Sequence, residues 1–191
     1  MEAPSFNGMT ESLTGKLLLA MPGIGDPRFE RAAILVCNHD ADGAIGIGLG
    51  RPSGLRLRAL LGKIGVEPGA ADDLPVLAGG PVEPQRGFVV HGLDWRSDET
   101  LDFTAEWGLS GTLDVLRAIA DGTGPARYLV ALGYAGWGPG QLDGELTRHG
   151  WFVADADEAL LFGVDPGERW SAAFARAGVD ARLLAATPGR A

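Results

Sequence analysis

Cysteine is almost absent from this sequence, since Cys37 is the only one among 191 residues. An internal disulfide and a Cys-x-x-Cys metal or redox motif are therefore excluded, and a reducing compartment is favoured. Long apolar runs are also missing, because none approaches the roughly 20 residues of a membrane span. The run Leu17–Met21 is too short for a signal-peptide core, and Glu2 and Glu11 stand where basic residues are expected. We expect a cytoplasmic protein that has no membrane partner.

Positive charge is scarce as well. The 16 Lys and Arg residues face 25 Asp and Glu residues, which gives a net charge of −9. This balance argues against non-specific nucleic-acid binding by the whole surface. One small basic face, made of Arg56, Arg58 and Lys63 on a predicted helix, is the only candidate for nucleic acid. Three cations on a helix are more often a solvated face.

Familiar catalytic fingerprints are missing too. The sequence has neither the Gly-x-Ser-x-Gly elbow nor an HExxH helix. Cys37 and His39 lie two residues apart on a predicted strand end, so their side chains could share a face and, with Asp26, support a hydrolase. The alternative is a small buried cysteine. The Cys37–His39 pair could also join His91 in a metal site, but three scattered ligands without HExxH or Cys-x-x-Cys spacing are weak evidence, and we predict no metal and no cofactor.

Glycine, by contrast, is abundant: 30 of the 191 residues are glycine, about twice the usual share of roughly 7%. The densest stretch, GYAGWGPG at 133–140, connects a predicted buried strand, 128–132, to a predicted helix, 139–149. We expect Gly138 as N-cap, Pro139 as first helical residue and a left-handed end at Gly150. Two readings remain open. Backbone N–H groups around Gly136, Trp137, Gly138 and Gly140 could bind an anion, or the stretch is a tight turn with Trp137 packed.

Three arginines beside Pro or Gly, or in a turn, are further candidate ligand-binding residues: Arg28, Arg51 and Arg86. Loops in such positions present side chains to ligands. The alternative is that these arginines form internal ion pairs, for example with Asp26 or Glu30, that fix the loops.

Hydrophobic periodicity predicts alternating strands and helices without a regular βαβ repeat. The predicted strands are 16–20, 32–37, 44–49, 76–78, 87–91, 128–132 and 151–154, with a hairpin turn at 38–43. The predicted helices are 55–64, 110–120, 139–149 and 167–177, and an acidic turn follows 154. The pattern predicts a mixed sheet with helices packed on it rather than a doubly wound parallel sheet. We divide the chain into a flexible N-terminus (1–12), a single domain (13–178) and a C-terminal tail (179–191).

Several motifs, in order, resemble the YqgE/AlgH family over about residues 13–163. They are Ala20–Gly23 with Asp26–Phe29, Cys37–Asp40, Gly43–Gly46 leading to Arg51-Pro52, Gly79–Val82 and Gly133–Leu142. Gly50 departs from the pattern, where the family usually has Asn. The resemblance implies a bacterial cytosolic protein with one α+β domain and a curved, partly barrel-like mixed sheet flanked by helices in α/β/α sandwich-like layers. It also implies a transcriptional regulator, without an agreed enzymatic activity.

Together these observations favour a non-enzymatic regulatory or binding protein. Its groove is expected between the glycine stretch and the Arg51 and Arg86 loops, and its partner is an unidentified protein or a small anionic ligand. The alternative is a hydrolase acting on a phosphoester or another anionic substrate near the glycine stretch. Direct DNA binding is a third, weaker hypothesis.

Overall fold

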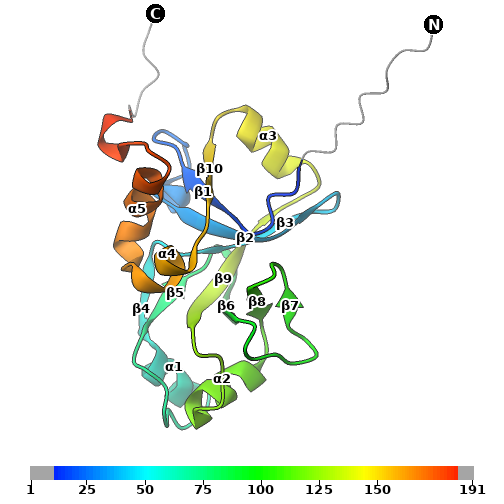
Figure 1. Ribbon diagram of the computed structural model, residues 1–191, viewed down its shortest axis with the longest axis vertical. Helices are drawn as coiled ribbons and strands as arrows, with labels where there is room; N and C mark the ends of the chain where they lie inside the picture. The colour runs from blue at the N-terminus through cyan, green and yellow to red at the C-terminus, as the bar shows by residue number, and fades with distance from the viewer. Residues whose placement is uncertain (1–10, 185–191) are drawn as a thin grey trace, which may run out of the picture.

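The computed structural model describes residues 11–184, and within them ten strands form one curled sheet (Figure 1). The strands are β1 Lys16–Ala20, β2 Ala33–Asp40, β3 Gly43–Gly48, β4 Pro52–Arg56, β5 Pro75–Ala78, β6 Val82–Gly92, β7 Leu101–Asp102, β8 Trp107–Ser110, β9 Tyr128–Trp137 and β10 Trp151–Asp155. Their order is β10-β1-β2-β3-β9-β6-β8-β7, with β5 beside β9 and β4 beside β5. Only the β5–β9 pair is parallel among these strands, so the sheet is mixed.

Five α-helices and three 3₁₀ turns occur in the same part of the chain. They are α1 Leu57–Lys63, α2 Leu113–Asp121, α3 Gln141–Thr147, α4 Glu158–Gly163 and α5 Arg169–Arg176, with η1 Pro27–Phe29, η2 Pro166–Glu168 and η3 Ala181–Leu183. None of these helices has the length and apolar character that crossing a bilayer would require.

The alternation of side chains along each strand builds a core on both faces of the sheet. In β1, Leu17 and Leu19 join the cluster that α4 and α5 cover, whereas Leu18 and Ala20 join the cluster that α3 covers. A third cluster lies between the sheet and the helices α1 and α2, at the opposite end from α3 (Figure 1). The predicted α+β fold, a curved mixed sheet flanked by helices, is thus confirmed.

Strand β9 lies at the centre of the sheet. The prediction that it ends at 132 and is followed by a glycine loop is wrong. The strand runs on to Trp137 and pairs with β3, β5 and β6, so residues 133–137 are strand. Gly133 has a φ of 74°, and a Cβ there would lie 2.4 Å from the Gly80 carbonyl oxygen. A Cβ on Gly79 would lie 2.2 Å from the Gly133 oxygen. These glycines therefore allow two backbones to approach closely.

The predicted ends of α3 are wrong by a few residues. Gly140, with a φ of 67°, is the N-cap, and Gly138 and Pro139 form a turn before it. The turn is closed because the Gln141 N–H donates to the Gly138 carbonyl and the Gly138 N–H donates to the Gln141 side chain. At the other end, His149 rather than Gly150 takes the left-handed conformation, with a φ of 59°.

Elsewhere the predicted elements are mostly confirmed with shifted ends. The hairpin of β2 and β3 forms, but β2 continues to Asp40 and leaves a two-residue turn. Helix α1 starts at Leu57, since Leu55 belongs to β4. Helix α4 replaces the predicted acidic turn, because the Asp157 carboxylate caps it by accepting from the Leu160 N–H. Strands β4, β7 and β8 were not predicted.

The predicted terminal segments lie largely outside the described residues. Of the N-terminal segment 1–12 only residues 11 and 12 are described, and of the tail 179–191 only 179–184. In that part of the tail, Val179, Ala181 and Leu184 pack against the core. The domain boundaries at 13 and 178 stay a prediction.

Candidate functional site

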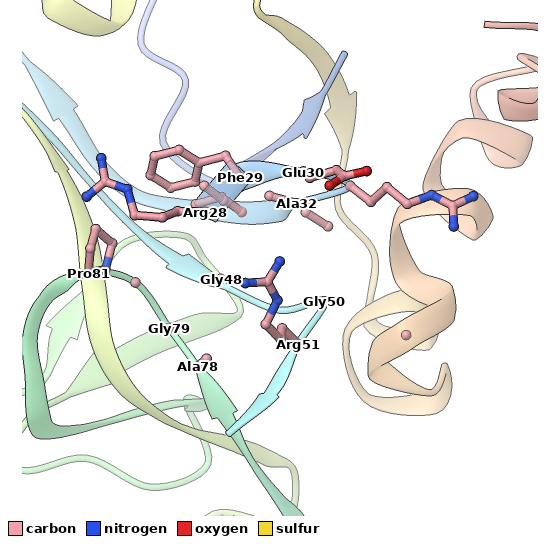
Figure 2. Close-up of a pocket in the computed structure, with 15 residues that line it drawn as sticks. Arg28, Phe29, Glu30, Ala32, Gly48, Gly50, Arg51, Ala78, Gly79 and Pro81 are labelled. Atoms are coloured by element: carbon pink, nitrogen blue, oxygen red, sulfur yellow. The ribbon is translucent and has the colours of Figure 1, made fainter. Parts of the chain in front are cut away.

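A pocket of about 470 Å³ opens where β2, β3 and β5 meet η1 and η2. Three chain segments line it, 28–34, 48–51 and 78–81, together with Gly167. Figure 2 shows these segments converging from elements that are distant in sequence. Its volume lies within the range of roughly 300–1,000 Å³ typical of small-molecule sites.

Hydrogen bonds and close backbone contacts fix the walls of this pocket. The Asp26 carboxylate caps η1 by accepting from the Arg28 N–H at 2.9 Å. The Gly48 N–H donates to the Gly79 carbonyl at 2.7 Å, and the Ala78 N–H donates to the Arg51 carbonyl at 2.8 Å. A Cβ on Gly48 would lie 2.9 Å from the Ala78 oxygen, so glycine is required for this approach.

Three arginines and one acid line the pocket, a local excess of positive charge in a chain of net charge −9. Arg28 pairs with Asp26 at 2.7 Å, and its hydrogen bond lowers the pKa of Asp26. The Arg31 guanidinium lies over the Trp170 ring at 5.1 Å. Arg51 has no ion pair and no side-chain hydrogen bond to any residue within 11–184. Figure 2 shows its guanidinium pointing across the pocket toward Ala32, while that of Arg28 points outward.

Arg169 holds the loop that carries Arg51. This arginine is buried, and burial lowers its pKa to about 10. Its guanidinium donates to the Leu49 carbonyl at 2.8 Å and to the Val164 carbonyl at 3.0 Å. The sequence analysis missed this residue, because its partner lies 120 residues away.

The residues of the groove that was predicted between the glycine stretch and the arginine loops do not all line one pocket. Arg28 and Arg51 line the pocket, but Arg86 does not, because it pairs with Glu83 at 3.1 Å and lies over the Phe88 ring. Gly136, Trp137, Gly138 and Gly140 are also outside the pocket lining.

Trp137 has a packing role instead. It is buried, and its Nε1–H donates to the Glu145 carboxylate at 3.0 Å. The Nε1–H of Trp151 donates to the same oxygen at 2.8 Å. One carboxylate thus ties α3 to the ends of β9 and β10.

A β-bulge separates the predicted Cys37–His39 pair. The register of β2 against β3 shifts between Val36 and Asn38. Cys37 consequently packs in the core beneath α4 and α5, and burial raises its pKa to about 12. His39 instead faces α3, with its Nε2 3.7 Å from the Asp143 carboxylate and its Nδ1 accepting the Leu13 N–H.

His91 lies in a buried polar network. Its Nδ1 faces the Gly92 carbonyl at 2.9 Å, so Nδ1 carries the proton and Nε2 accepts from the Ser110 hydroxyl at 2.9 Å. Ser110 also bonds Thr100 at 2.9 Å. Both His91 and Ser110 are about 1% exposed or less, so a substrate cannot reach them. Across residues 11–184 no three His, Cys, Asp or Glu side chains are grouped as a metal site.

Two of the three residues of the predicted basic face, Arg56 and Arg58, make contacts within the fold. Arg56 pairs with Asp73 at 3.2 Å, and Arg58 donates to the Ala71 carbonyl at 2.9 Å. These contacts fix the loop after α1.

Comparison with known proteins agrees with this fold. The family model described as AlgH-like matches residues 17–182. This chain belongs to the AlgH-like family. A UPF0301 protein of Rhizorhabdus wittichii is 56% identical over 192 residues and covers all of both chains, and one of Sphingopyxis alaskensis is 55% identical over 93% of this chain and 96% of its own.

Two solved structures share the AlgH-like fold. The solution structure of the AlgH protein from Pseudomonas aeruginosa superposes with a TM-score of 0.78 at 40% identity and covers all of both chains. The crystal structure of protein DIP2367 from Corynebacterium diphtheriae has a TM-score of 0.70 at 22% identity, over 92% of this chain and 90% of its own, and supports the fold alone. The resemblance read from the sequence is confirmed, and the family match extends beyond residue 163 to include α5.

Proposed function

We propose that this AlgH-like chain is a non-enzymatic binding protein of the bacterial cytoplasm and that it holds a small anion on Arg51. The main support is the unpaired Arg51 guanidinium, which points across a pocket whose lining includes several glycines without side chains. A planar guanidinium matches carboxylate and phosphate oxygens in a bidentate way. Partial enclosure strengthens that attraction relative to open water.

The pocket lining supports binding more than catalysis. Glu30 is its only carboxylate, and it is exposed. The candidate hydrolase residues are engaged in other contacts: Cys37 is in the core, His39 faces α3 and Asp26 pairs with Arg28. No hydrolase is proposed, since no nucleophile and base share this pocket.

The protein would have a regulatory role if ligand binding changes the surface that it presents to a protein partner. The pocket is lined both by sheet segments and by Gly167 of the C-terminal segment, so an occupant would bridge the two. The transcriptional role implied by the family resemblance would then act through a protein partner, because Arg56 and Arg58 of the small basic face already contact the loop after α1.

A thermal-shift screen with anionic metabolites tests this proposal. A ligand at 100 times its Kd stabilises the folded state by about 2.7 kcal/mol, and we expect at least one anion to raise Tm accordingly. The shift should disappear in Arg51→Gln and persist in Arg96→Gln, an exposed arginine that pairs with Asp102 and is not part of the pocket lining. The proposal fails if no anion shifts Tm, or if the shift survives in Arg51→Gln.

A further inference from the structure

We infer that the ligand is an amphipathic organic oxyanion, with one carboxylate or phosphate group on an apolar, preferably planar, body. This inference depends on the proposed function, because it assigns a chemical class to the ligand of the same pocket. The inference is based on the charged and apolar side chains that line the pocket together with Arg51.

The free charge in the pocket suits a single oxyanion group. Arg28 is ion-paired with Asp26, whereas Arg31, which lies over Trp170 and keeps its charge, and Arg51 have no ion pair within 11–184. Against these two positive charges stands Glu30, so the lining keeps one net positive charge. The carboxylates of Asp26 and Glu30, one beside Arg28 and one in the lining, would repel a second negative group. A polyphosphate is therefore disfavoured.

The remaining wall suits an apolar body. Phe29, Ala32 and Pro81 all line the pocket and retain exposed surface. Phe29 packs edge-on against Trp151, with 5.6 Å between the ring centroids, so its position is fixed. The glycines at 48, 50, 79 and 80 add no side chains that would narrow the space.

The size of the cavity points the same way. About 470 Å³ is roughly fifteen times the 30 Å³ that one water molecule takes in the liquid. A bare phosphate or acetate ion on Arg51 would leave most of this space to water. An apolar group attached to the anion would displace that water from Phe29 and Pro81, which is favourable.

Calorimetric titration of the full chain with six probes tests this inference: inorganic phosphate, pyrophosphate, phenyl phosphate, acetate, phenylacetate and benzyl alcohol. Phenyl phosphate or phenylacetate should bind at least about tenfold more tightly than its bare anion, since burying a ring exceeds that free energy. Benzyl alcohol, which has a ring without a charge, should not bind detectably. Whichever ring-bearing anion binds more tightly identifies the head group.

Variants separate the two ends of the site. Arg51→Gln should lower the affinity for the ring-bearing anion by about tenfold or more, because a charge-assisted hydrogen bond is lost. Arg96→Gln should leave this affinity unchanged. Phe29→Leu, which keeps an apolar contact with Trp151, should reduce the preference for the ring-bearing over the bare anion. Pro81→Ser provides a second test of the apolar wall if Phe29→Leu lowers Tm.

The outcomes distinguish this inference from the proposed function. Equal affinity for bare and ring-bearing anions, with loss of both in Arg51→Gln, would overturn the amphipathic ligand and leave anion binding intact. Tighter binding of pyrophosphate than of phenyl phosphate would also overturn it. If no probe anion binds, or if binding is indifferent to Arg51→Gln, both proposals fail.

Discussion

At the scale of single residues, the same residue type has different roles according to its surroundings. Arg51 is unpaired in a pocket, Arg86 lies over Phe88 and Arg169 is buried against carbonyl groups. The sequence context of Arg51 and Arg86 is similar, since each neighbours Pro or Gly. Their roles differ because Glu83 is available to Arg86 as an ion-pair partner.

The Cys37 thiol should be inert in the folded protein. Burial raises its pKa to about 12, so at pH 8 only roughly one molecule in ten thousand carries the thiolate. We expect a thiol reagent such as iodoacetamide to modify the native chain orders of magnitude more slowly than the chain unfolded in urea. Mass spectrometry after timed quenching measures both rates. Fast native labelling would revive Cys37 as a nucleophile.

At the scale of elements, two polar contacts hold helices on the sheet. Glu145 ties α3 to Trp137 and Trp151, and Arg169 ties α5 to the loop after β3. Each contact joins a helix to a strand end or to the loop that follows a strand, so it adds specificity to the apolar packing beneath.

Replacement of Arg169 should loosen the C-terminal segment. In Arg169→Met the Leu49 and Val164 carbonyls lose their donor, and unsatisfied buried groups cost about 1–3 kcal/mol. Urea unfolding followed by circular dichroism measures the change. Arg182→Ala is the matched control, because its side chain is 88% exposed and should alter stability by less than about 0.5 kcal/mol. A fully stable Arg169→Met variant would show that α5 docks without this contact.

At the scale of the whole molecule, His91 should make stability depend on pH. Burial lowers the pKa of His91 below its ordinary 6.5 in the folded state, although Asp94 and Asp102 act in the opposite direction. Below pH 6.5 the unfolded chain therefore binds the proton more readily than the folded one. The stability that neutral His91 confers is present above pH 6.5 and is lost as the pH falls toward its folded pKa.

Tm should consequently be higher at pH 7.5 than at pH 5.5. An NMR titration of the imidazole assigns the effect to His91, whose signal should titrate below pH 6.5. A His91 midpoint at or above 6.5 would contradict the buried neutral ring.

The sequence by itself determined the strands and helices that have clear periodicity, together with the family. Apolar runs such as those in β1, β2 and the first half of β9 must be buried whatever their partners, so their position follows from local pattern. Ordered motifs along 150 residues identified the AlgH-like family for the same reason, because they depend only on chain order.

The tertiary structure alone decided which residues share a site. Cys37 and His39 are two residues apart, yet a one-residue bulge directs them to opposite faces. The glycines of β9 resembled a ligand loop, but Gly133 serves the close approach of Gly79 and Gly80, which are more than 50 residues earlier in the chain. Arg51 became a candidate because no partner reaches it. Such pairings depend on contacts between distant segments, which no local pattern specifies.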